Sequence, residues 1–563
     1  MVHVLEVAFG MSESMVDAGA NTETSDTGPP RVDTVVVGAG FAGMYMIHRM
    51  IQQGRSVRCF EGGTDVGGTW YWNRYPGARC DVESMEYSYD FDEQLQQEWE
   101  WTEKYATQPE ILAYAQHVAD RFDLRNHITF GTRVESAVLD ESAGRWIVTT
   151  DDGGTVSAQF LVMATGCLSS ANLPDIEGRD AFTGELVHTG RWPHHEVQFE
   201  GKRVGVVGTG SSGIQAIPVI ARTAEHLTVF QRTAQFTIPA RNGPLDPVEQ
   251  QRVKTEYAAF RERNRQMFAA FGSKYLRPAT DALDTDPDEF HREMEFLWER
   301  GGAMFLSGFR DFMRSPEANH MAADFVRGKI AEMVDDPATA ALLTPDGLIG
   351  CKRLVIDTDY YVTYNRPNVS LVDVSEQGTP ITRITPTGIQ AGDQHHDLDV
   401  LVFATGFDAM TGSLLRVDIR GRGGKRLADE WQAGPTTYLG LGVHGFPNLF
   451  TVAGPGSPSV LANMIIATEQ HVDWISDCMA YMRDQGLDLI EADAESVASW
   501  VEHVNAVADR TIFPSCNSWY VGANIPGKPR VFMPLPGFPA YVETCNNVAA
   551  NNYEGFVFET VTA

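Results

Sequence analysis

Short, strongly apolar runs rich in β-branched residues recur along the chain, and each ends in glycine. They stand in "DTVVVGAG", "FLVMATG", "KRVGVVGTG", "LDVLVFATGFD" and "LFTVAGPGSPS". Short apolar runs bounded by turn signals are typical of buried strands. Helix-like patterns follow the first and the third run. The chain therefore shows a repeated order of strand, glycine turn and helix, which predicts an α/β fold.

A different pattern fills the region from about 245 to 345. Apolar residues recur there at the spacing of one helix face. They are Phe290, Met294 and Leu297 in "EFHREMEFLWER", and Phe325, Ile330 and Met333 in "ANHMAADFVRGKIAEMV". We expect a helical insertion without chemistry of its own, which is structural or forms part of the wall around a substrate.

The first glycine turn has the spacing of a dinucleotide-binding loop. Gly38, Gly40 and Gly43 follow a strand and open a helix, an arrangement in which the backbone approaches a pyrophosphate at the helix N-terminus. Eighteen residues past Gly43, the next strand ends in Glu61. A carboxylate at this place accepts hydrogen bonds from both ribose hydroxyls and repels a 2′-phosphate. We therefore expect FAD or NAD at the first loop, and not NADP.

The second loop repeats the pattern with a different end. Gly208, Gly210 and Gly213, with Ser211 and Ser212 among them, follow "KRVGVV". The strand after this loop ends in Arg232 and Thr233 instead of an acid. A guanidinium and a hydroxyl suit a 2′-phosphate, which favours NADPH over NADH. The alternative is that Arg232 is an ordinary solvated arginine.

The two loops predict two dinucleotide-binding, Rossmann-like domains, one for FAD and one for NADP. The runs that end in Ala-Thr-Gly mark the crossings between them. We expect an FAD-binding domain in two parts, 32–169 and 407–563, the second with a C-terminal lid loop. An NADP-binding domain over 170–406 carries the helical insertion. Residues 1–31 are small, polar and acidic in their later half, which predicts a disordered extension.

Composition excludes several classes of function. The formal net charge is −31 and the sequence pI about 4.8, whereas nucleic-acid binding needs a basic surface. No apolar run reaches the length of a membrane span. The seven cysteines include no Cys-x-x-Cys pair and no metal-ligand spacing, so we expect seven buried thiols, no disulfide and no metal. These features favour a cytoplasmic protein, which we expect to be a monomer.

A chain that binds a flavin and NADPH fits three classes of reaction. A disulfide reductase needs a redox Cys-x-x-Cys, and none is present. A simple flavin reductase needs no further motif, and a monooxygenase needs a means of stabilising a flavin peroxide.

The stretch "FTGELVHTGRWP" just before the second loop discriminates between the remaining classes. Phe182, Gly184, His188, Trp192 and Pro193 match the fingerprint Phe-x-Gly-x-x-x-His-x-x-x-Trp-Pro. The chain thereby resembles the Baeyer–Villiger monooxygenases; related N-hydroxylating monooxygenases lack the Trp-Pro end. The resemblance runs from about Val32 to about Phe558. "GGTWYWNRYPGARCDVES", "GCKRLVIDTDYYVTYNRPNV" and "SWYVGANIPGKPRVF" place it nearest the phenylacetone and steroid monooxygenase branch.

The resemblance implies an oxygenation reaction. NADPH reduces FAD, O2 adds to the flavin, and the resulting flavin peroxide attacks a small-molecule ketone to give an ester or lactone. An N- or S-oxygenating enzyme, an uncoupled NADPH oxidase and a flavin-binding protein without turnover stay open as alternatives.

The resemblance also implies roles for single residues. Arg353 matches the catalytic arginine and Asp81 the acid that orients it, although Asp81 could instead pair with Arg79 in a surface salt bridge. Lys352 resembles the lysine that joins Arg232 at the 2′-phosphate. His188 is expected to act in a hinge and not in the chemistry.

Further residues are expected to line the cofactor and substrate sites. Thr69, Trp70 and Tyr87 are placed near the flavin, with Tyr71 packing beside them, and Trp519 resembles a lid tryptophan over the nicotinamide, unless it is a plain core tryptophan. The substrate pocket is expected to include Ser459, Val460, Leu461 and Met464, from "SPSVLANM".

Overall fold

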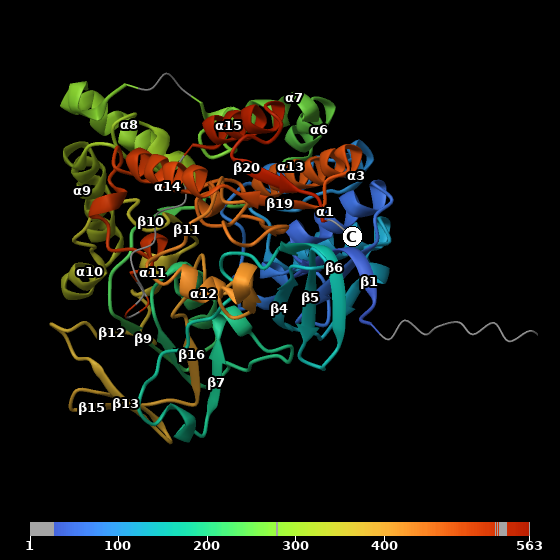
Figure 1. Cartoon of the computed structure of the whole chain (residues 1–563). Helices are drawn as coiled ribbons and strands as arrows, with labels where there is room; N and C mark the ends of the chain where they lie inside the picture. Colours follow the sequence, from blue (N-terminus) through green and yellow to red (C-terminus); the bar gives the residue numbers. More distant parts are fainter. Residues whose placement is uncertain (1–27, 277–279, 524, 526, 528–536, 562–563) are drawn as a thin grey trace, which may run out of the picture.

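The computed structural model describes residues 28–276, 280–523, 525, 527 and 537–561, and it is built around two separate sheets (Figure 1). The extension predicted over 1–31 lies outside the described residues as far as residue 27, and the first strand already begins at Arg31. Most of the predicted lid loop beyond Trp519 also lies outside them.

The first sheet has eight strands in the order β17-β4-β5-β6-β1-β2-β3, with β18 paired to β6. Their bounds are β1 Arg31–Val37, β2 Val57–Glu61, β3 Ile128–Phe130, β4 Val134–Asp140, β5 Arg145–Thr150, β6 Thr155–Met163, β17 Asp418–Arg420 and β18 Leu449–Thr451. The neighbours β6, β1, β2 and β3 are parallel. Since β17 and β18 come late in the chain, the C-terminal part returns to the sheet that the N-terminal part begins.

The second sheet is parallel throughout, in the order β12-β9-β8-β16-β7. Its strands are β7 Glu185–His188, β8 Arg203–Val207, β9 His226–Gln231, β12 Val369–Asp373 and β16 Val400–Phe403. β8 and β16 are the runs predicted to be buried, and four of the five residues of β8 and all four of β16 are buried. The predicted α/β fold with two Rossmann-like sheets is confirmed.

Small sheets complete the strand inventory. β13 Ile381–Thr385, β14 Gly388–Ala391 and β15 Gln394–Asp397 form an antiparallel meander after β12. β10 Thr237–Pro239 pairs with β11 Val355–Asp357, and β19 Leu489–Ala492 pairs with β20 Phe556–Glu559.

The region from 245 to 345 is helical, as predicted. It contains α6 Pro247–Thr255, α7 Tyr257–Arg265, α8 Pro287–Arg300, α9 Pro316–Met333 and α10 Pro337–Leu343. Four of these helices begin with the same local signal, an Asp or Ser whose side chain accepts a backbone N–H, followed by proline; the N-caps are Asp246, Asp286, Ser315 and Asp336. Proline suits the first helical position because its missing N–H would have no partner there.

The remaining helices come from before, between and after the strands of the two sheets. They are α1 Phe41–Gln52, α2 Thr69–Trp72, α3 Glu93–Glu98, α4 Gln108–Arg121, α5 Ser211–Ile220, α11 Tyr360–Thr363, α12 Leu427–Glu430, α13 Met464–Gln485, α14 Ala494–Ala508 and α15 Phe538–Ala550. α1 and α13 pack side by side, and Arg49 of α1 pairs with Asp473 and Asp477 of α13. Within the described ranges, no helix is both long and apolar enough to cross a membrane.

Candidate active site

One cavity of about 2570 Å³ extends between the two sheets. Both glycine loops line it, together with loops from the helical insertion and from the C-terminal part of the chain. Most of the site residues predicted from the sequence line this cavity. They are far apart in the chain, from Gly38 to Trp519.

The first glycine loop has the geometry of a pyrophosphate cradle. Gly38 has φ +101°, and a Cβ there would lie 2.7 Å from the Ala164 carbonyl oxygen. A Cβ on Gly43 would lie 1.9 Å from the Gly38 carbonyl oxygen, so the helix can approach the turn only with glycine. No side chain caps α1 at Gly40. The N-terminus of α1 is therefore available to an anion in the cavity.

Glu61 ends β2 beside this loop, as predicted. Its carboxylate is buried and accepts hydrogen bonds from the Ala39 amide at 2.8 Å and the Gly63 amide at 2.7 Å. These bonds fix the carboxylate at the cavity wall. Its remaining lone pairs suit ribose hydroxyls.

The second loop shows the same cradle with more open space. Gly208 has φ +108°, and a Cβ on Gly213 would lie 2.3 Å from the Gly208 carbonyl oxygen. At Gly210, which lines the cavity, an added Cβ would meet no atom of the described residues within 4 Å apart from its own local backbone. The open space at this loop is compatible with a pyrophosphate. Ser211 and Ser212 also line the cavity at the start of α5.

Two cations lie together beyond the second loop. Arg232 and Thr233 follow β9 and line the cavity with Lys352. Burial and the positive charge of Arg232 both lower the pKa of Lys352. Among the ion pairs of the described residues, neither Arg232 nor Lys352 has an acidic partner. Two close cations without a counter-charge, in a chain of net charge −31, fit a phosphate ligand.

Arg353 and Asp81 form a two-point ion pair in the cavity wall. Arg353 Nε donates to Asp81 Oδ2 at 2.5 Å and Nη2 to Asp81 Oδ1 at 2.8 Å. Burial disfavours the charged carboxylate, but the charge and hydrogen bonds of Arg353 outweigh it and lower the pKa of Asp81. Arg353 Nη1 donates to the Val460 carbonyl at 2.7 Å. The guanidinium is thus fixed from two sides.

The alternative pairing of Arg79 with Asp81 is wrong. Arg79 Nη1 instead pairs with Glu103 at 2.7 Å and donates to the Tyr105 carbonyl at 2.9 Å. Arg79 lies in an isolated β-bridge with Thr107. In a regular strand, Arg79 and Asp81 would point to the same side, because they are two residues apart. The chain bends directly after Cys80, so Asp81 turns to Arg353 instead.

Aromatic residues close one side of the cavity. Thr69 and Trp70 stand on α2, and the Trp70 indole donates to the Tyr87 hydroxyl at 3.2 Å. Trp70 and Tyr87 both line the cavity. Tyr71 points away from it, because its hydroxyl accepts from the Thr64 amide at 3.0 Å.

The fingerprint stretch lies at the junction of the two sheets. His188 ends β7, its Nδ1 accepts from the Gly190 amide at 2.9 Å, and its Nε2 lies 3.2 Å from the Thr405 hydroxyl. Burial lowers the pKa of His188 to about 4, so the imidazole is neutral near pH 7. The Trp192 amide donates to the Trp72 carbonyl at 3.3 Å, and Thr189 lies 3.0 Å from Ser212.

The ends of the fingerprint have packing roles. Phe182 packs in the cluster beneath the second sheet, and a Cβ on Gly184 would lie 2.4 Å from the Asp399 carbonyl oxygen. Trp192 is buried against Phe199, with the half-buried Pro193 following it.

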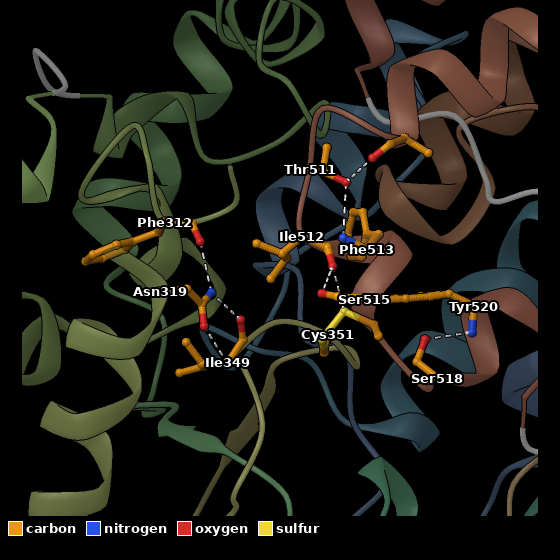
Figure 2. Close-up of a disulfide and its surroundings, with 12 residues drawn as sticks. Phe312, Asn319, Ile349, Cys351, Thr511, Ile512, Phe513, Ser515, Ser518 and Tyr520 are labelled. Atoms are coloured by element: carbon orange, nitrogen blue, oxygen red, sulfur yellow. Dashed lines mark hydrogen bonds between the residues drawn. A yellow bond between two sulfur atoms is a disulfide. The ribbon is translucent and has the colours of Figure 1, made fainter. Parts of the chain in front are cut away.

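Two cysteines contradict the expectation of seven free thiols. Cys351 and Cys516 form a disulfide, with a Cα–Cα distance of 5.3 Å and a sequence separation of 165 residues (Figure 2). Cys59, Cys80, Cys167, Cys478 and Cys545 are buried free thiols. The expectation was wrong because the fold brings together two loops that have no local pairing signal. The described residues contain no cluster of His, Cys, Asp and Glu that could hold a metal.

Comparison with known proteins decides the family. The model of the flavin-binding monooxygenase-like family matches residues 31–255. A protein named Baeyer-Villiger monooxygenase, from Pseudooceanicola batsensis, is 42% identical over 95% of this chain and 98% of its own. The chain belongs to the Baeyer–Villiger monooxygenases.

Solved structures agree with this placement. A steroid monooxygenase bound to NADP is 54% identical, with a TM-score of 0.89 over 94% of this chain and 99% of its own. A structure titled "OTEMO complex with FAD and NADP" is 42% identical, with a TM-score of 0.90 over 94% and 100%. As a Baeyer–Villiger monooxygenase, the chain uses FAD and NADPH, and it inserts one oxygen atom of O2 next to a ketone carbonyl. Both glycine cradles fit these cofactors.

The pocket residues predicted for this Baeyer–Villiger monooxygenase divide into two groups. Val460 and Met464 line the cavity, whereas Ser459 and Leu461 are not among its lining residues. Ser459 has φ +42°, and its hydroxyl donates to the Ala453 carbonyl at 3.2 Å. The left-handed backbone at Ser459 turns its side chain into the core, a feature that the sequence does not reveal. Trp519 is half-buried and lines the cavity.

Proposed function

We propose that Arg353, held by Asp81, is the catalytic cation of oxygen insertion in this chain. The observation that carries the proposal is the bidentate pair between the two side chains at the cavity wall. Arg353 remains charged at every physiological pH, since burial is outweighed by Asp81 and the pKa of Arg353 is raised. A fixed positive charge stabilises the oxyanion that develops on an attacked carbonyl.

Bound FAD, reduced by NADPH, supplies the activation of O2. The residues of the chain supply orientation and exclusion of water. Asp81 and the Val460 carbonyl hold the guanidinium in one geometry, so no reorganisation is needed when charge develops. Val460 and Met464 form part of the wall against which the ketone lies, and Trp519 covers the nicotinamide side of the cavity.

The two cradles divide the cofactors between them. We assign FAD to the loop of Gly38, Gly40 and Gly43, with its ribose at Glu61 and its flavin ring near Thr69, Trp70 and Tyr87. We assign NADPH to the loop of Gly208–Gly213, with the 2′-phosphate between Arg232, Thr233 and Lys352. The fingerprint, with His188 at its centre, couples the two halves, as its contacts to Trp72, Ser212 and Thr405 suggest.

The assignment of the two cofactors also divides the chain into two domains. Residues 32–169 and 407–563 form the FAD-binding domain, supported by the pairing of β17 and β18 with the first sheet. Residues 170–406 form the NADP-binding domain. We propose that the enzyme acts on small ketones as a cytoplasmic monomer. Five of the seven cysteines are free thiols, as in a reducing compartment, where a disulfide such as Cys351–Cys516 is usually a redox-responsive one.

The test is product mass. The flavin-loaded enzyme is incubated with NADPH, ¹⁸O2 and a panel of phenylacetone, a steroid ketone and cyclohexanone, with a sulfide and an amine as competing substrates. An ester or lactone with one labelled oxygen is expected. Arg353→Ala should still let NADPH reduce the flavin while ester formation falls by about 10²-fold or more. Ester formation at the wild-type rate in Arg353→Ala would remove the proposed role of Arg353.

A further inference from the structure

The Cys351–Cys516 disulfide joins two segments that both line the cavity. Cys351 stands two residues before Arg353, and Cys516 stands three residues before Trp519. The bridge therefore connects the segment of the catalytic cation to the segment of the aromatic lid (Figure 2).

The Cys351 side of the bridge is firmly anchored. Asn319 of α9 is fully buried, and its amide nitrogen donates to the Ile349 carbonyl at 2.8 Å and the Phe312 carbonyl at 2.9 Å. The Ile349 amide donates back to Asn319 Oδ1 at 2.9 Å. Two residues after Cys351, Arg353 is fixed by Asp81. This segment is a rigid support.

The Cys516 side has different connections. The Cys516 amide donates to the Phe513 carbonyl at 2.9 Å, and the Ile512 amide donates to the Met313 carbonyl at 3.0 Å. Beyond Cys516, the short helix Trp519–Val521 makes its backbone bonds within its own segment: the amides of Val521 and Ala523 donate to the Ser518 carbonyl, and that of Gly522 donates to the Trp519 carbonyl. The lid segment is locally folded, and its covalent link to the support is the disulfide.

The lid segment also lies beside Arg353, because Tyr520 packs in the same apolar cluster as Val460, whose carbonyl accepts from Arg353 Nη1 at 2.7 Å. Burial raises the pKa of Tyr520 to about 12, against the effect of the nearby Arg353 charge. Trp519 and Tyr520 pack together, with ring centroids 4.3 Å apart. A shift of Cys516 would therefore move an aromatic pair that borders both the cavity and the catalytic cation.

We propose that the Cys351–Cys516 disulfide is a redox-sensitive tether that positions Trp519 and Tyr520 against Arg353. It thereby sets how much NADPH oxidation ends in ester and how much in hydrogen peroxide. The inference rests on the proposed role of Arg353. Its physical basis is that a lid protects the oxygenating cavity from water only while it is held closed.

The redox step is a thiol–disulfide exchange. A dithiol attacks the bridge, two electrons pass to the protein, and two thiols form at Cys351 and Cys516 while the dithiol becomes a disulfide. A peroxide reverses the step: it accepts two electrons from the two thiols, the bridge re-forms, and two molecules of water leave when the oxidant is hydrogen peroxide. Cys516 is only 4% exposed, but Cys351 and Cys516 both line the cavity, so small reagents reach the bridge through it.

The experiment compares the holoenzyme in two thiol states. Alkylation and mass spectrometry should find five free thiols in the air-equilibrated protein, since the bridge takes two of the seven cysteines, and seven after reduction by a phosphine that is then removed anaerobically. Reduction should raise the ratio of hydrogen peroxide formed to NADPH consumed by about threefold or more and raise KM for the ketone. NADPH-driven flavin reduction should stay within about twofold.

Variants separate the tether from general damage. Cys351→Ser and Cys516→Ser should match the reduced enzyme and stop responding to the phosphine. Cys478→Ser removes a buried free thiol of α13 that is not among the lining residues of the cavity, and it should respond like wild type.

Two results would contradict the proposal that the Cys351–Cys516 disulfide is a redox-sensitive tether. One is seven free thiols in the air-equilibrated protein, and the other is an equal peroxide-to-NADPH ratio in both thiol states. Neither depends on the Arg353→Ala result, so the tether and the role of Arg353 can fail separately.

Discussion

At the scale of single residues, the proposed 2′-phosphate site predicts that Arg232 decides which nicotinamide cofactor the enzyme prefers. Arg232→Ala should weaken NADPH binding by about 10- to 100-fold, because a charge-assisted bond to the 2′-phosphate is lost. NADH, which lacks that phosphate, should bind almost as before. The measurement is KM for each cofactor. Arg366→Ala, which removes an arginine that is not among the lining residues of the cavity, is the matched control. Equal losses for NADPH and NADH would contradict the assignment.

A second residue-scale prediction concerns Glu469 of α13. Burial raises its pKa from 4.5 to about 8, and its Oε1 accepts from the Asp90 amide at 2.7 Å. The folded protein therefore holds a proton that the unfolded chain releases above pH 4.5. The associated stability is complete below pH 4.5 and is lost as the pH rises to about 8.

Glu469→Gln keeps an oxygen acceptor for Asp90 and removes the titration. The melting temperature of this variant relative to wild type should rise steadily between pH 5 and pH 8. The comparison at each pH cancels the titration of the other groups. A difference that stays constant over this range would show that Glu469 is ionised in the folded protein at pH 5.

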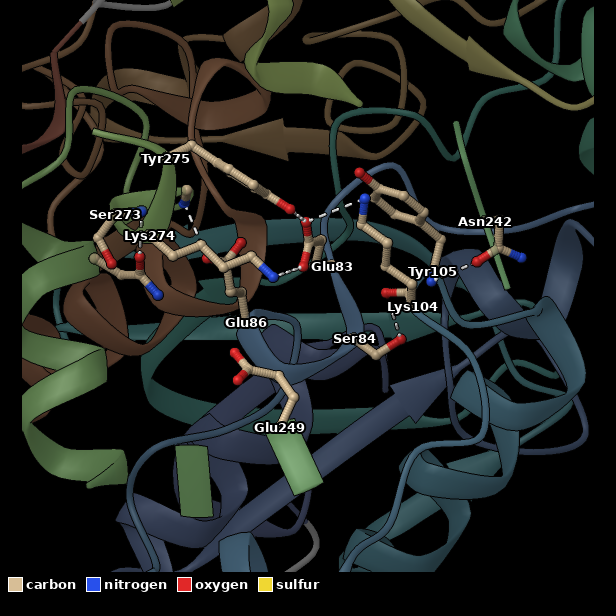
Figure 3. Close-up of polar contacts among 12 residues, drawn as sticks. Glu83, Ser84, Glu86, Lys104, Tyr105, Asn242, Glu249, Ser273, Lys274 and Tyr275 are labelled. Carbon is tan, nitrogen blue, oxygen red and sulfur yellow. Dashed lines mark hydrogen bonds and ion pairs between the residues drawn. The ribbon is translucent and has the colours of Figure 1, made fainter. Parts of the chain in front are cut away.

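At the scale of elements, the helical insertion is fastened to the loop that carries Asp81. Glu83 accepts from Lys274 and from the Tyr275 hydroxyl, both from the insertion, and lies 3.7 Å from Lys104 (Figure 3). Its side chain is only 9% exposed. Removal of one partner from such a cluster leaves uncompensated charges.

Glu83→Gln should therefore destabilise the protein by about 3–5 kcal/mol, measured by chemical unfolding. Adding Lys274→Met to Glu83→Gln should recover part of this loss, because it removes one of the unpaired cations. If the double variant were less stable than Glu83→Gln by the full cost of Lys274→Met alone, the two residues would not be coupled.

The elements also show how far the sequence could be interpreted. β8 and β16 were predictable because each is a short apolar run that becomes almost entirely buried, and α8 because its apolar positions follow one face. The pair of Arg353 with Asp81 followed from the family resemblance alone, since 272 residues separate them. The Cys351–Cys516 bridge and the inward turn of Ser459 depend on tertiary contacts and on a single left-handed backbone angle, and neither leaves a pattern in the sequence.

At the scale of the whole molecule, we expect both cofactors to stabilise the folded chain, because they bind in the cavity between the two sheets. The cavity has one cradle from each sheet, so each cofactor that binds the folded chain should add to its stability. A cofactor at a hundredfold excess over its Kd contributes about 2.7 kcal/mol. Flavin-free protein should melt at the lowest temperature, FAD should raise the melting temperature, and NADP⁺ should raise it again.

Gly210→Ala tests whether the second increase arises at the predicted cradle. A Cβ at Gly210 meets no atom of the described residues within 4 Å apart from its own local backbone, so the variant should fold with wild-type stability and keep the full effect of FAD. The methyl group would occupy the space of the pyrophosphate, and the effect of NADP⁺ should vanish. An unchanged response to NADP⁺ in Gly210→Ala would place that cofactor elsewhere. Gly213→Ala gives the contrast: its Cβ would lie 2.3 Å from the Gly208 carbonyl oxygen, so it should destabilise the protein even without any cofactor.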